Sequence, residues 1–95
     1  MAKRLVISKK AYTDIDKIVE FNNYRNKSKT YSEKFIKNLQ KQLTLLVKHP
    51  LIGKHTDMPD TLLLVWDNYY IFYIDNEDTI EIRSIYHQRE NVPFK

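Results

Sequence analysis

The segment TLLLVWDNYYIFYIDNEDTIEIRSIYH, residues 61–87, sets the fold class. It contains three β-prone runs, Thr61–Trp66, Tyr69–Asp75 and Thr79–His87, separated by turn-prone residues at 67–68 and 76–78. The middle run is apolar or aromatic at nearly every position, which is typical of a central strand covered on both faces. The segment therefore predicts three consecutive strands, with 69–75 in the middle of the sheet.

A first helix is expected after a short strand at Arg4–Ser8. Ser8 offers the side-chain oxygen of a good N-cap residue, and apolar residues then recur at helical spacing. The apolar stripe consists of Ala11, Ile15 and Ile18, widened by Tyr12 and Val19. The charged residues that fall outside this stripe are Asp14, Asp16, Lys17 and Glu20. The helix should end within residues 22–29, where asparagine and serine favour a turn.

A second helix is expected from Thr30 to just before Pro50. Thr30 and Glu33 have the spacing of a capping box, and Pro50 ends the helix because the residue before a proline avoids helical angles. The apolar face consists of Ile36, Leu39, Leu43 and Leu46, and the opposite side carries Lys34, Lys37, Lys41 and Lys48. An irregular loop at 49–60 follows. Its one glycine, Gly53, is expected to hold a positive φ.

The element order is thus β-α-α-β-β-β, and residues 1–95 are expected to form one domain. Two consecutive amphipathic helices form a hairpin that needs an apolar surface to cover, and a sheet provides one. The predicted fold is α+β, with the two-helix hairpin packed on one face of a small, mainly antiparallel sheet. The other face of the sheet should be at least partly open.

Composition excludes several kinds of site. The chain has no cysteine, so disulfides, thiolate metal sites and cysteine nucleophiles are ruled out, and its three scattered histidines make no zinc pattern. We expect no cofactor. The net charge of +4 suits nucleic acid or an acidic protein as partner, and it suits solubility alone equally well. The N-terminus lacks the apolar core of a signal peptide, and the longest apolar run, 62–66, is too short to cross a bilayer, so we expect a soluble, unprocessed, cytoplasmic protein.

The end of the last strand carries the candidate site. Because side chains two residues apart share a face of a strand, Arg83, Ile85, His87 and Arg89 are expected on one side, with Ile82, Ser84 and Tyr86 on the other. Cleavage of RNA through its 2′-hydroxyl needs an acid and a base, and cations that stabilise the phosphorane. His87 could be the acid or base, and Arg83 and Arg89 the cations.

Plainer interpretations of the same residues remain open. His87 could be a surface histidine at a strand end, and Arg83 could pair with Glu81 or with a helix carboxylate. Lys54 and His55, in the loop after Gly53, could add positive charge beside the site or be ordinary loop residues.

Several segments, taken in order, resemble the RelE/ParE superfamily of bacterial toxins from type II toxin–antitoxin systems. The resemblance covers almost the whole chain. It rests on SKKAYTDIDKI in the first helix, FIKNLQKQLTLLVKHPLIGK in the second helix and loop, NYYIFYI in the central strand, and DTIEIRSIYHQRENVP at the end. It implies a small cytosolic toxin neutralised by an antitoxin from the same operon, with which it forms a hetero-oligomer.

Toxins of this superfamily either cut mRNA on the ribosome, without a metal ion, or inhibit DNA gyrase. The nucleases tend to carry an arginine in the middle strand, where this chain has Tyr70, and the ending IEIRSIYHQREN resembles the ParE-like branch. The resemblance therefore leaves it undecided whether the protein is an enzyme. In both cases we expect Lys54, His55, Tyr70 and Tyr86 to contact the target beside Arg83, His87 and Arg89. The alternative is a degenerate, non-catalytic toxin that only binds antitoxin or acts as a co-repressor.

Overall fold

A computed structural model describes residues 3–26 and 29–88 of the protein. Its elements follow the predicted order closely, and the three strands of the segment 61–87 have the predicted bounds. The elements are β1 (Arg4–Ile7), α1 (Lys9–Asn26), α2 (Thr30–Lys48), β2 (Lys54–His55), β3 (Thr61–Trp66), β4 (Tyr69–Asp75) and β5 (Thr79–His87). The two-residue strand β2 lies in the segment that was expected to be irregular.

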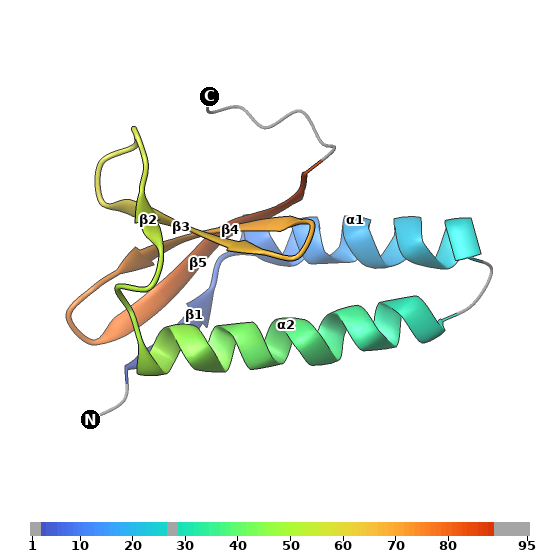
Figure 1. Ribbon diagram of the computed structural model, residues 1–95, viewed down its shortest axis with the longest axis horizontal. Helices are drawn as coiled ribbons and strands as arrows, with labels where there is room; N and C mark the ends of the chain where they lie inside the picture. Colours follow the sequence, from blue (N-terminus) through green and yellow to red (C-terminus); the bar gives the residue numbers. More distant parts are fainter. Residues whose placement is uncertain (1–2, 27–28, 89–95) are drawn as a thin grey trace.

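The strands form one sheet in the order β1-β5-β4-β3-β2, so β4 is central as predicted. Only β1 and β5 run parallel; the other neighbouring pairs are antiparallel, which confirms the mainly antiparallel sheet. Helices α1 and α2 form an antiparallel hairpin whose connected end extends beyond the sheet (Figure 1). The predicted α+β fold is confirmed.

The hydrophobic core lies between the helical hairpin and one face of the sheet. Leu39 and Leu46 of α2 and Ile18 of α1 are buried against Ile71 of β4 and Ile82 of β5. At one end of this core the rings of Phe35, Trp66 and Tyr69 pack within 4.9–5.7 Å of one another. The helices therefore cover a single face of the sheet and leave the other available for contacts.

The two helix starts differ from one another. Ser8 caps α1 as predicted, because its Oγ accepts a 3.1 Å hydrogen bond from the N–H of Ala11. The predicted capping box of α2 is wrong. The chain enters the helix one residue earlier, so that Lys29 is the N-cap, without a side-chain cap, and Thr30 is already helical.

The prediction for Gly53 is also wrong, since Gly53 has no positive φ; Asp60 and Asp67 adopt that conformation instead. A glycine is required at position 53 because there is no room for a side chain. A Cβ at this position would lie 2.5 Å from the hydroxyl of Tyr73. That hydroxyl accepts a hydrogen bond from the N–H of Gly53 and donates one to the carbonyl of Pro50, each 2.8 Å long. The loop after α2 is thereby tied to the central strand.

Candidate functional site

The sheet face opposite the helices is the first candidate surface. Cross-strand neighbours share a face, so the register places Val65, Tyr70 and Tyr86 in one row across three strands. The next row contains Leu63, Phe72 and Ser84. We call these six residues the open face. Val65 is 50% exposed, Tyr70 and Tyr86 are half-buried, and the ring of Tyr86 lies edge-on to that of Phe72, with centroids 5.9 Å apart.

A lysine stands at each edge of the open face. Lys54 of β2 is paired with Leu63, which places it in the row of Phe72 and Ser84 at the β2 edge. At the other edge, Lys10 of α1 places its Nζ 4.5 Å from the centre of the Tyr86 ring. The open face is therefore an aromatic surface between two cations, and an anionic or aromatic partner could contact both.

Lys10 is held in place by Asp14, one helical turn further along α1. Its Nζ donates hydrogen bonds of 3.1 and 2.9 Å to the two carboxylate oxygens of Asp14. Partial burial lowers the pKa of Lys10, but hydrogen bonds to Tyr86 and Asp14 and the attraction of Asp14 raise it more, so the pKa lies above its ordinary value. Lys10 therefore stays charged beside Tyr86 at neutral pH.

Asp14 also anchors α1 to the sheet. It is only 7% exposed, and its carboxylate accepts a 3.1 Å hydrogen bond from the N–H of Ile85, on the part of β5 that extends beyond β1. Sequence reasoning missed both Lys10 and Asp14, since Asp14 lies outside the apolar stripe of α1. The available signal was the i, i+4 spacing of a lysine and a carboxylate in the first turns of the helix.

The structure does not bring Arg83 and His87 together on one face. Ile82 pairs with Tyr73 and Ser84 with Phe72, so Arg83 is an extra residue at a β-bulge. The bulge reverses the alternation, and the predicted grouping of Arg83, Ile85 and His87 against Ile82 is wrong. Strict alternation cannot anticipate an inserted residue.

Arg83 and His87 consequently have different surroundings. Arg83 forms a 3.0 Å ion pair with Glu81, one of the plainer interpretations of its sequence position. His87 pairs across the strands with Tyr69 on the face covered by the helices, and the two rings meet edge-on with centroids 5.2 Å apart. Arg89 lies outside the described residues.

The second candidate surface is a pair of shallow grooves along α2. One lies between α1 and α2, the other between β1 and α2, and Gln40 borders both. The first is lined by Val19, Asn23, Lys29, Ser32, Glu33, Ile36, Lys37 and Gln40, the second by Lys3, Leu5, Ile7, Gln40, Leu43, Thr44 and Val47. His55 borders neither; it lies in a third hollow beside Leu62 and Asp75.

The described part of the chain contains neither a candidate metal cluster nor a membrane-spanning helix. No group of three or more histidine, aspartate or glutamate side chains there is arranged to hold a metal ion. Neither helix is long and apolar enough to cross a membrane.

Comparisons with known proteins agree with the fold. A family profile described as the ParE toxin of the type II toxin–antitoxin system parDE matches residues 5–92. Among solved structures, a protein of the chromosomal ParDE system of P. aeruginosa superimposes with a TM-score of 0.75 at 17% identity, covering 90% of this chain and 96% of that one. An arginine-to-alanine double mutant of the E. coli toxin RelE, in the free state, gives 0.64 at 20% identity, covering 94% and 86%. No curated protein sequence matches.

Proposed function

Because the chain belongs to the ParE toxin family of type II toxin–antitoxin systems, we propose that it arrests growth by inhibiting DNA gyrase without catalysis. The observation that carries this proposal is the separation of Arg83 from His87 across the β-bulge. A nuclease needs its acid, base and cations around one phosphate. Here the arginine pairs with Glu81, and the histidine packs on Tyr69 at the other face of the sheet.

The open face is the proposed docking patch for the target. Its row Val65, Tyr70 and Tyr86 is apolar and aromatic and partly exposed, and its edges carry Lys10 and Lys54. An apolar, aromatic centre with a polar rim is the usual anatomy of a protein–protein interface. Tyr70 stands where the nuclease branch of the superfamily tends to have an arginine, which agrees with docking rather than cleavage.

Ribosome-dependent, metal-independent cleavage of mRNA is the second candidate. Lys10 beside the ring of Tyr86 favours it, because a cation and a phenol on one surface could take part in phosphate chemistry without His87. In that case Lys10 and Tyr86 would carry the reaction, Lys54 would bind the substrate, and His87 would be dispensable.

The two candidates are separated by expressing the protein without its antitoxin and measuring growth, supercoiling by purified gyrase, and cuts in mRNA. Gyrase inhibition predicts growth arrest, loss of supercoiling by purified gyrase, and mRNA without codon-linked cuts in primer extension. Tyr70→Ala and Tyr86→Ala should each reduce the inhibition, while the control Tyr12→Ala, an exposed aromatic of α1, should not. Codon-linked cuts that disappear in Lys10→Ala would refute gyrase inhibition and support cleavage of mRNA on the ribosome. Normal growth would leave only the binding or co-repressor role.

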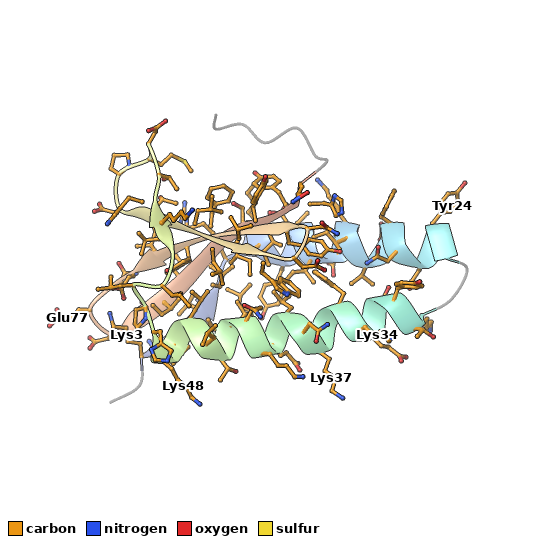
Figure 2. All side chains as sticks on the ribbon, viewed as in Figure 1. Lys3, Tyr24, Lys34, Lys37, Lys48 and Glu77 are labelled. Atoms are coloured by element: carbon orange, nitrogen blue, oxygen red, sulfur yellow. The ribbon has the colours of Figure 1, made fainter. Side chains whose placement is uncertain are left out.

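We further propose that the cognate antitoxin binds along α2. This helix carries four lysines and one glutamate, and the grooves beside it have apolar floors formed by residues such as Ile36, Leu43 and Val47. Lys37 and Lys48 point away from the sheet (Figure 2). An acidic segment with apolar side chains would match both the charge and the grooves.

A further inference from the structure

One side of α1 carries exposed lysines and aromatic residues. Lys10, Lys17, Phe21 and Tyr24 follow one another at spacings of seven, four and three residues, which places them along one side of the helix. We call these four residues the α1 stripe. Of the exposed carboxylates of α1, Asp16 lies away from the stripe, whereas Glu20 stands beside it, three residues after Lys17 and four before Tyr24. Asp14 lies on the same flank but is buried, with its charge paired with Lys10.

The aromatic residues of the α1 stripe are unusually exposed. Phe21 is 58% and Tyr24 86% exposed, and Tyr24 lies at the end of α1 that extends beyond the sheet (Figure 2). Large apolar side chains in water are costly, and a contiguous set of them marks an interaction surface more often than an accident of packing. Lys17, also exposed, precedes Phe21 by one helical turn.

The α1 stripe continues the open face. Its first member, Lys10, lies over the ring of Tyr86, so the two surfaces meet at the edge of β5. At 1.5 Å per residue, the helix carries the stripe about 21 Å from Lys10 to Tyr24. The joined surface thus presents tyrosine, lysine, lysine, phenylalanine and tyrosine in succession, with the exposed Glu20 at its margin.

We propose that the α1 stripe, together with Tyr86, binds a single strand of nucleic acid. Exposed aromatic rings stack on unpaired bases, and the exposed Lys17, between Tyr86 and Phe21, can neutralise a phosphate. In a duplex the bases are already stacked and paired, so the rings of Phe21 and Tyr24 cannot stack on them and should bind a duplex more weakly. Binding of an oligonucleotide to the purified protein can be measured whether or not gyrase is the target. This inference can therefore fail or succeed independently of the proposed function.

The test is fluorescence anisotropy of the full chain with a labelled oligothymidylate of about twelve nucleotides, a length within the usual range of single-strand sites. Phe21→Ala and Tyr24→Ala should each weaken binding by about fivefold or more, because each removes one stacking platform. Lys17→Ala should flatten the dependence of log K on log salt by about 0.7, the share of one phosphate contact. Oligouridylate of the same length shows whether RNA or DNA is preferred.

The matched control is Tyr12→Ala. Tyr12 is 57% exposed on α1, nearly the same as Phe21, but it lies on the side of the helix away from the stripe. It should bind the oligonucleotide as the unchanged protein does. The inference is overturned if Tyr12→Ala weakens binding as much as Tyr24→Ala, if a duplex binds more tightly than the single strand, or if no binding occurs at low salt. Growth arrest that needs Phe21 and Tyr24 without any oligonucleotide binding would overturn it in favour of a protein partner.

Discussion

Tyr73 illustrates how one side chain can fix the loop after α2. It is fully buried, yet its hydroxyl bonds the N–H of Gly53 and the carbonyl of Pro50. Tyr73→Phe would keep the ring and leave both groups without this partner. We expect a loss of about 1–3 kcal/mol in the free energy of unfolding, measured by urea denaturation. Val65→Ala, at an exposed position of β3, is the control, and an equal loss there would contradict the argument.

Tyr73 should also make the fold sensitive to alkali. Burial raises its pKa, only partly opposed by the hydrogen bond from Gly53. A raised pKa in the folded state means that its stabilising contribution is complete below the unfolded value of about 10 and is lost as pH rises through the folded value. Stability should therefore fall above about pH 10, less steeply in Tyr73→Phe than in the unchanged protein. Some slope should remain, because the pKa values of Tyr69 and Lys10 are raised as well.

Gly53→Ala tests the same contact from the other side. The added Cβ would lie 2.5 Å from the Tyr73 hydroxyl and 2.9 Å from the carbonyl oxygen of Leu63, so the loop must shift. We expect a loss of about 1–3 kcal/mol. In a double-mutant cycle the loss should be smaller when residue 73 is already phenylalanine, since one of the clashing atoms is gone. Strict additivity of the two changes would rule out the proposed contact.

At the level of elements, the sequence was sufficient to predict the bounds of a strand wherever turn-prone residues and hydrophobic periodicity agreed. β3, β4 and β5 begin and end as predicted, because turn-prone residues at 67–68 and 76–78 bound each apolar run. β2 was missed because two residues show no period. The capping box failed because the spacing of Thr30 and Glu33 does not reveal where the helix begins. Pairing of elements distant in sequence, as of β1 with β5, is not encoded in local patterns.

The candidate site was less predictable than the fold, because it depends on contacts between elements that are distant in sequence. The bulge at Arg83 depends on how β5 meets its neighbours, so alternation alone placed Arg83 and His87 on one face. Lys10 and Asp14 lie beside the open face because α1 passes the edge of β5, more than 70 residues away in sequence. Lys54, Tyr70 and Tyr86, by contrast, share the open face and its edge, whereas His55 does not; that they contact a target stays a prediction.

Asp14 is the element-scale link between α1 and β5, and its removal should loosen both. Asp14→Ala leaves the buried N–H of Ile85 without its acceptor, and we expect a loss of about 1–3 kcal/mol. Asp14→Asn can still accept that bond and should lose less, although Lys10 loses its ion pair. Hydrogen exchange at the amide of Ile85 should accelerate in the alanine variant alone. The exposed Asp16→Ala is the control, with a change within about 0.5 kcal/mol; equal effects at both positions would refute the anchoring role.

The whole molecule carries three candidate binding surfaces: the open face, the α1 stripe and the grooves along α2. The open face and the α1 stripe meet at Lys10, whereas the grooves of α2 border the other side of the helical hairpin and the β1 edge. The net charge of +4 is therefore unevenly spread, since α2 alone has three more lysines than carboxylates. An acidic partner approaching from solution would be steered toward α2 first.

This charge distribution predicts how antitoxin association responds to charge reversal. Lys37→Glu with Lys41→Glu reverses two charges of α2, and Lys9→Glu with Lys54→Glu makes the same change in net charge away from α2. All four lysines are exposed. If the cognate antitoxin binds along α2, the first pair should slow association about tenfold or more at low salt, because opposite charges there accelerate encounter. The second pair should slow it much less, and salt should reduce the difference.

Stopped-flow fluorescence measures both association rates. Equal slowing by the two pairs would show that only net charge matters. Greater slowing by the second pair would place the antitoxin's acidic segment on the open face instead.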